Sequence, residues 1–172
     1  LIHKLIKYKL MSKLFSGFGE ADLETYIVHF PKSITILYLY GLTFTCDLLE
    51  TLAAHLPNLT DLIFDNCSWR GSSFEVSKLG NQIPFPFPKL QNLEMCPHIY
   101  FDKNARIVLH PDAVLKRLVI DNFITFLNSS DILLNVNELV LEGQVIKDIP
   151  KMVLTSKLNH LSVLTLRQSK PW

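Results

Sequence analysis

Six carboxylates recur beside large apolar residues in an alternating pattern and hold the clearest potential for chemistry. They are Asp61, Asp65, Glu94, Asp121, Glu138 and Glu142, and Tyr38 and Tyr40 precede them in a segment of the same alternation. Clustered carboxylates attract cations, and tyrosine anchors interfaces because its ring is apolar and its tip is polar. If these side chains share one surface, we expect it to bind a protein partner with a basic surface. The alternative is that they are ordinary polar residues on a solvated sheet.

Residue types that support catalysis are scattered. The six histidines lie far apart, and His29 and His55 occupy equivalent positions in two repeats, which favours a packing role. Residues 17–19, Gly-Phe-Gly, are too short for a phosphate-binding loop and lack its following glycine. No Cys-x-x-Cys, His-x-x-x-His or nucleophile-elbow motif is present. The sequence therefore predicts no enzyme activity, no metal site and no cofactor.

A repeat determines where the acidic positions fall. Leucine fills 30 of the 172 positions, and an L-x-x-L-x-L pattern starts at residues 34, 59, 90, 115, 136 and 161, with a weaker copy at residue 5. Three of the copies follow a hinge that ends in Pro31, Pro57 or Pro88. In each copy the x-L-x-L-x core predicts a short strand with its leucines on one face, and identical strands stack in parallel to bury that face.

The residues between the leucines then form three columns on the opposite, concave face. The first is Ile36, Asp61, Asn92, Arg117, Glu138 and Val163; the second is Tyr38, Ile63, Glu94, Val119, Val140 and Thr165; the third is Tyr40, Asp65, Cys96, Asp121, Glu142 and Arg167. These columns hold six acids and two bases in a chain whose net charge is +1. We therefore expect a local acidic stripe beside an aromatic end.

The segments between strands are predicted to return along the convex side. Residues 21–30 and 47–56 have helical spacing of apolar residues and each precedes a proline. Residues 83–88 alternate proline with Phe85 and Phe87, which either plug the core or stand exposed as partner anchors. Residues 1–15 form either a solenoid element or a basic amphipathic helix for a membrane or partner groove.

Together these features resemble the leucine-rich-repeat superfamily, in particular the irregular repeats of F-box and ribonuclease-inhibitor-like proteins. Cys67 stands at the asparagine-or-cysteine turn position of that repeat. The resemblance implies an α/β solenoid, residues 1–172, of about six to seven repeats, with a curved parallel sheet on the concave side and helices and loops on the convex side. It also implies the substrate-recognition region of an F-box-type ubiquitin ligase subunit, joined to a cullin-type adaptor through a segment outside this sequence. A non-catalytic scaffold or regulatory subunit is the alternative.

Charge and targeting signals exclude several other classes. A net charge of +1 disfavours nucleic acid as a partner. The longest uncharged run has 14 residues, and a membrane-spanning helix needs about 20. Three unpaired cysteines favour an intracellular location, cytoplasmic or nuclear, whereas sequons at Asn58, Asn66 and Asn128 would favour an extracellular one if glycosylated. The chain starts at Leu1, from which we expect a segment of a longer protein.

Overall fold

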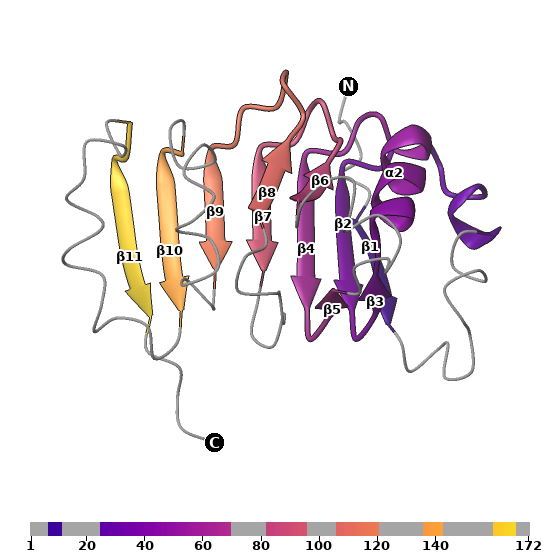
Figure 1. The fold of residues 1–172 in the computed structure, drawn as a ribbon, viewed down its shortest axis with the longest axis horizontal. Helices are drawn as coiled ribbons and strands as arrows, with labels where there is room; N and C mark the ends of the chain where they lie inside the picture. Colours follow the sequence, from indigo (N-terminus) through magenta and orange to yellow (C-terminus); the bar gives the residue numbers. More distant parts are fainter. Residues whose placement is uncertain are drawn as a thin grey trace.

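Seven parallel strands form the central sheet of this protein in a computed structural model (Figure 1). The structure describes residues 7–11, 25–69, 82–95, 106–120, 136–142 and 160–167. In order across the sheet, the strands are β1 (Lys7–Met11), β2 (Ile36–Tyr40), β4 (Asp61–Asp65), β7 (Asn92–Met95), β9 (Arg117–Ile120), β10 (Glu138–Glu142) and β11 (Val163–Arg167). Because sequential strands are neighbours and all are parallel, the chain coils in one direction and the fold is a parallel β-solenoid.

All six strand pairs share a single register. Leu37 pairs with Leu62, which pairs with Leu93, and the ladder continues to Leu164. The carbonyl of Thr35 accepts the amides of Thr60 and Asp61 at 2.8 and 3.0 Å, and the same forked bond recurs before each following strand. The predicted columns of leucines and of intervening residues are therefore confirmed at every described position.

The weak first copy of the repeat is a strand of the same sheet. In β1, Tyr8 and Leu10 lie in register with Leu37 and Leu39. For residues 7–11, the solenoid interpretation of the basic N-terminal segment is confirmed over the amphipathic helix. Residues 1–6 and 12–15 lie outside the described part of the chain.

The back of the solenoid differs from the prediction. One helix, α2 (Cys46–His55), lies there with two short parallel ladders, β3 (Thr43–Phe44) with β5 (Ser68–Trp69) and β6 (Gln82–Phe85) with β8 (Arg106–Leu109). Among the described return segments, the helices expected along the convex side are therefore not evident beyond α2 and a short turn at residues 25–27, and β3, β5, β6 and β8 are strands. Alternating prolines explain one case, since they exclude a helix from residues 83–88 but fit an extended edge strand such as β6.

Helix α2 confirms the predicted helix at 47–56 to within one residue at each end. Thr45 caps it: the Leu48 amide donates to Thr45 Oγ1 at 3.2 Å, and Asp47 lies in the first turn, where an acid favours the helix dipole. The other predicted helix, 21–30, is helical only at residues 25–27 and turns at 28–30, while residues 21–24 are outside the described ranges. The amide of Phe30 donates to the Ile27 carbonyl at 3.0 Å, which closes this short turn.

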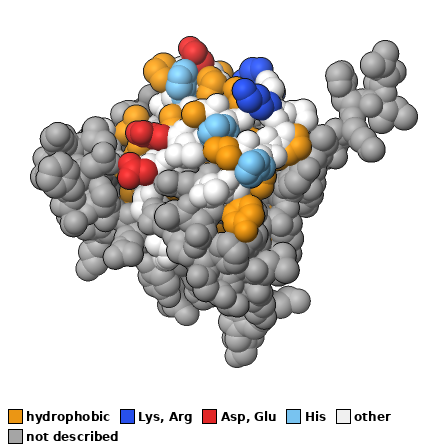
Figure 2. Space-filling model, turned by 90° about the vertical axis from the view of Figure 1, so that its right-hand side faces the viewer, with side chains coloured by type: hydrophobic (Ala, Val, Ile, Leu, Met, Phe, Trp, Pro, Cys, Tyr) orange, Lys and Arg blue, Asp and Glu red, His pale blue; other side chains and the backbone are white. Residues whose placement is uncertain are grey.

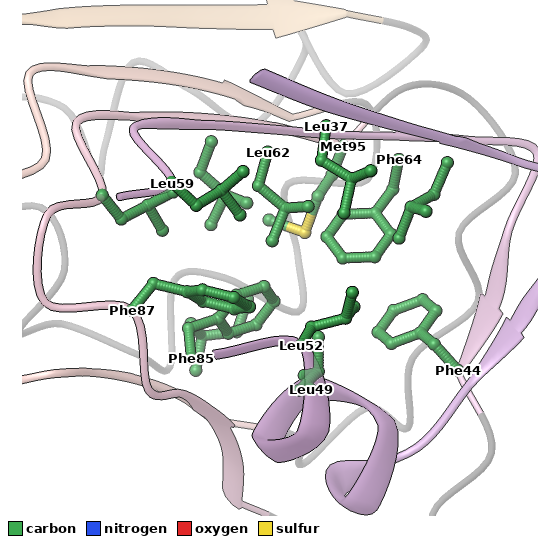
Figure 3. Close-up of a cluster of buried hydrophobic side chains, with 14 of the residues drawn as sticks. Leu37, Phe44, Leu49, Leu52, Leu59, Leu62, Phe64, Phe85, Phe87 and Met95 are labelled. Atoms are coloured by element: carbon green, nitrogen blue, oxygen red, sulfur yellow. The ribbon is translucent and has the colours of Figure 1, made fainter. Parts of the chain in front are cut away.

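The core lies between the sheet and its back layer, and Figure 3 shows the two facing rows of side chains. Leu37, Leu62, Phe64 and Met95 project from the sheet, and Phe44, Leu49, Leu52, Phe85 and Phe87 face them from the return segments. Three of the phenylalanines contact in sequence: the ring centroids of Phe44 and Phe64 are 4.5 Å apart, and those of Phe64 and Phe85 are 6.1 Å apart. Phe85 and Phe87 have 0% exposed surface, so the core interpretation of the proline-rich segment is confirmed over exposed anchors.

Each described turn that follows β2 or β4 needs a left-handed residue. Gly41 has φ 66° and Asn66, its equivalent one coil later, has φ 51°, a region open to glycine and tolerated by asparagine. Cys67 follows, and its thiol lies 3.5 Å from the carbonyls of Leu39 and Asp65. The residue at this position does turn inward as the repeat predicts, but it serves carbonyl oxygens and not the loop amides that the general pattern suggests.

Candidate functional site

The predicted site residues lie on the outer face of the sheet, which we define as the side chains that alternate with the buried leucines. Tyr38, Tyr40, Asp61, Asp65 and Glu94 are all half-buried there. Glu138 is half-buried on the same face of β10. The parallel register brings these six residues, from four strands, onto one continuous surface.

Asp121 and the side chain of Glu142 lie outside what the structure describes. The backbone of Glu142 is the last position of β10, in register with Arg167 of β11. Cys96, the third-column residue next to Asp65, also falls outside the described ranges. The described part of the predicted stripe therefore spans β2, β4, β7, β9 and β10.

Neutral donors hold the two aspartates of β4. The Tyr38 hydroxyl donates to Asp65, and Asn92 Nδ2 donates to Asp61 Oδ1 at 2.6 Å. The Thr60 hydroxyl lies 2.5 Å from the second oxygen of Asp61. No ion pair joins either aspartate to a cation among the described residues. Hydrogen bonds from neutral groups orient a carboxylate without cancelling its charge, so both aspartates remain available to attract a cation.

The two glutamates are neutralised in part by one arginine. Arg117 Nη1 lies 3.1 Å from Glu94 Oε2, and Arg117 Nε lies 3.4 Å from Glu138 Oε1. Burial by itself would lower the pKa of Arg117, but the hydrogen bonds and charges of Glu94 and Glu138 outweigh it and raise that pKa. Arg117 therefore stays charged and bridges the two acids across three strands.

These contacts divide the acidic stripe into two parts of different character. At β7 to β10 two acids share one base, whereas at β4 the two aspartates have no described cationic partner. Asp61 and Asp65 flank Ile63 on the same face of one strand, so their backbone positions are about 13 Å apart at ~3.3 Å per residue. Ile63 lies in register with Tyr38, which places an apolar and aromatic centre between two anions.

Part of the outer face is closed. Val119 of β9 and Val140 of β10 pair in register, and both have 0% exposed surface although they lie in the second column of that face. These two positions lie in the predicted column but are closed to solvent. A partner therefore finds the accessible centre of this face on β2, β4 and β7.

Other candidate chemistry is weak in the described part of the chain. No group of three or more His, Cys, Asp or Glu residues there has a geometry suited to a metal ion. His29 is exposed and His55 is half-buried, so the expected packing role is wrong for His29. Burial raises the pKa of the Cys67 thiol, against the backbone hydrogen bonds at Leu42, Asp65 and Gly41 that lower it. A buried, protonated thiol is a poor nucleophile, so Cys67 is suited to packing.

The end of the molecule near α2 shows no dominant charge. Figure 2 views that side and shows histidine, acidic and basic side chains interspersed with hydrophobic ones over the described surface. No helix in the described ranges combines the length and apolar character that crossing a membrane requires.

Comparison with protein-family models, with curated protein sequences and with solved structures finds no match to this chain. The columns predicted from the sequence place Asn92 and Arg117 beside the acids. They do not predict the hydrogen bonds and ion pairs that these two residues make. Thr60 was missed, although its place just before β4, next to Asp61, was the available signal.

Proposed function

We propose that this protein is a non-catalytic recognition module that binds a partner protein through the outer face of its sheet. The proposal depends on one observation: Tyr38 and Ile63 form an apolar centre flanked by Asp61 and Asp65, whose described partners are neutral, and Tyr40 lies in register with Asp65. Tyrosine and desolvated apolar groups supply binding energy, and the flanking charges supply orientation and a faster encounter.

The spacing of the two anions predicts the form of the ligand. An extended strand advances about 3.3 Å per residue, so basic residues at i and i+4 match the ~13 Å between Asp61 and Asp65. An aliphatic residue at i+2 then lies over Ile63. Because the separation exceeds the Debye length of about 8 Å at physiological salt, the two charge pairs contribute independently.

A peptide experiment tests this geometry. We expect a labelled peptide with arginine at i and i+4 and leucine at i+2 to bind in fluorescence anisotropy, and a peptide with arginines at i and i+2 to bind less tightly. Replacing Asp61 and Asp65 by lysine should weaken the first peptide at least about fivefold, since two exposed ion pairs at ~0.5 kcal/mol or more each are lost. Raising the salt concentration should weaken it as well.

A matched variant separates local from overall charge. Glu50→Lys with Asp112→Lys changes the net charge by the same amount at two exposed positions away from the outer face. The proposal predicts nearly unchanged affinity for this variant. Equal losses in both double variants would mean that only net charge matters, and the site would be rejected.

Photo-crosslinking extends the test to a natural partner. A benzoylphenylalanine placed at Tyr40 should crosslink a partner protein in cell extract, and the same group at Ala54, exposed on α2, should not. Addition of Asp61→Lys and Asp65→Lys should abolish the Tyr40 product. Crosslinking that is equal at both positions would contradict binding through this face.

We propose further that the solenoid is a leucine-rich repeat of the irregular F-box type and acts inside the cell as the substrate receptor of a cullin-type ubiquitin ligase. The repeated L-x-x-L-x-L pattern in one register and the inward Cys67 support the repeat class. The strand ladders behind the sheet depart from the helix-backed form of that repeat class, and a non-catalytic scaffold or regulatory subunit is the alternative. Capture of a cullin adaptor by the full-length protein supports the ligase role, and its failure leaves the scaffold.

A further inference from the structure

The turns that lead into β2, β4 and β7 form a rim at the amino-terminal end of the outer face. We define the rim as residues 31–33, 57–58 and 88–89. It holds two exposed lysines, Lys32 and Lys89, and no acid. The carboxylates Asp61, Asp65 and Glu94 follow inside the strands. In these coils the sign of the charge therefore changes from positive to negative along the strand direction.

The side chain of Asn58 fixes the position of one of these lysines. Lys89 Nζ donates to Asn58 Oδ1 at 2.7 Å, and Asn58 Nδ2 donates to the Lys32 carbonyl at 3.1 Å. Lys89 belongs to the turn before β7, but its ammonium group reaches back to the turn before β4. The positive charge therefore lies at the start of the strand that carries Asp61 and Asp65.

The charge of Lys89 is oriented but not cancelled. No ion pair joins Lys89 or Lys32 to a carboxylate within the described ranges. A neutral amide acceptor holds an ammonium group in place and leaves its charge free to attract an anion. Asn58 precedes Asp61 by three residues, which is at most about 10 Å of chain. Along β4 a ligand therefore meets one cation and then two anions, and the described partners of all three are neutral.

We propose, on the basis of the recognition function above, that the ligand of the outer face is an extended segment with a basic core and acidic residues at one end, which pair with Lys89. Every second side chain of an extended segment faces the same side. The core uses positions i, i+2 and i+4, so acids at the second and fourth positions beyond the arginine at Asp61 also face the protein. They lie about 7 and 13 Å from that arginine, which brackets the chain length between Asp61 and Asn58.

Attraction to an acidic face and pairing with Lys89 predict opposite effects of an added acid. On the outer face Asp61, Asp65, Glu94 and Glu138 outnumber the one base, Arg117, among the described side chains. If net charge alone decided affinity, acids added to the ligand should weaken binding. Pairing with Lys89 predicts tighter binding, by about two- to fivefold for an exposed ion pair with one partner already held in place.

Fluorescence anisotropy at low ionic strength with three labelled peptides tests this pairing. The first peptide has only the arginine–leucine–arginine core, the second adds glutamate at the second and fourth positions before the core, and the third adds them after it. Both extended peptides are needed because the core reads the same in either chain direction. We expect at least one of them to bind about threefold more tightly than the core peptide.

Three variants locate the source of the gain. In Lys89→Glu the extended peptide should bind no more tightly than the core peptide, and in Lys89→Arg the gain should remain. Lys116→Glu is the matched control, because Lys116 is also exposed at the start of a strand and lies two strands away from β4. The gain should remain in this control.

Two results would overturn the role of Lys89 and leave the recognition function intact. The first is a core peptide that binds while neither extended peptide binds more tightly. The second is a gain that survives Lys89→Glu or is lost equally in Lys116→Glu. Absence of binding by the core peptide itself overturns both proposals, so the two failures are distinguishable. Circular dichroism checks that the variants remain folded.

Discussion

Leucines at equivalent register positions should differ in their contribution to stability according to the coil in which they lie. Leu139 is fully buried, whereas its partner Leu164 is 39% exposed. Leucine-to-alanine removes three carbons, which at about 0.8 kcal/mol per buried group amounts to ~2.4 kcal/mol at full burial. The cavity left by Leu139→Ala adds to this, so we expect a total of about 3–4 kcal/mol. For Leu164→Ala, about three fifths of the transfer term applies and no closed cavity forms, which leaves about 1.5 kcal/mol.

Urea unfolding followed by far-ultraviolet circular dichroism measures both costs, with the slope m compared between variants to confirm that the same surface unfolds. The expected difference between the two variants is at least about 1.5 kcal/mol. Costs that agree within about 0.5 kcal/mol would refute the reasoning, because they would mean that the inner face of β11 is as well covered as that of β10.

Three further predictions concern single residues. Thr45→Ala should lower the unfolding free energy by about 1 kcal/mol, since the Leu48 amide loses its acceptor at the start of α2, and Thr45→Ser should restore most of it in thermal or urea unfolding. Asn66→Val should cost about 1–2 kcal/mol because a β-branched residue resists φ 51°, whereas Asn66→Gly, which copies Gly41, should be close to neutral in the same assay. Burial raises the pKa of Cys67, so the folded chain retains a proton that the unfolded chain loses; the unfolding free energy should fall as pH rises above about 9, and Cys67→Ala should lack that component of the decrease in urea titrations at several pH values.

The sheet could be predicted because one face of each strand must be buried. A shift of one residue would expose Leu62 and Phe64 and bury Asp61 and Asp65, so the alternation fixes the face of each side chain, and the aligned copies of the repeat predict the register. The return segments carry no such constraint. They need only cover the core, and a strand such as β6 does so as well as a helix.

The sequence predicts which positions form the site, but not which of its charged side chains are neutralised by a neighbour. Tyr38 donates a hydrogen bond to Asp65, and Arg117 pairs with two glutamates. Both contacts depend on side-chain conformations, which the order of residues in the columns does not specify. The closure of the outer face at Val119 and the exposure of Leu164 were equally beyond the pattern. Both features depend on which part of the chain lies over each strand. The repeat pattern is the same in both coils, so it does not predict the difference.

The short ladders behind the sheet have a consequence for the shape of the surface in front. Neighbouring strands are about 4.8 Å apart, whereas a helix is about 10 Å wide with its side chains. Where β6 pairs with β8, the back layer and the sheet both advance by one strand spacing per coil, so these coils stack without bending. Where α2 lies, the back is wider than the front, which wedges adjacent coils into an arc. For the described coils, we therefore expect a flat outer face where the β6–β8 ladder lies behind the sheet, and a bend beside α2 that the β3–β5 ladder limits.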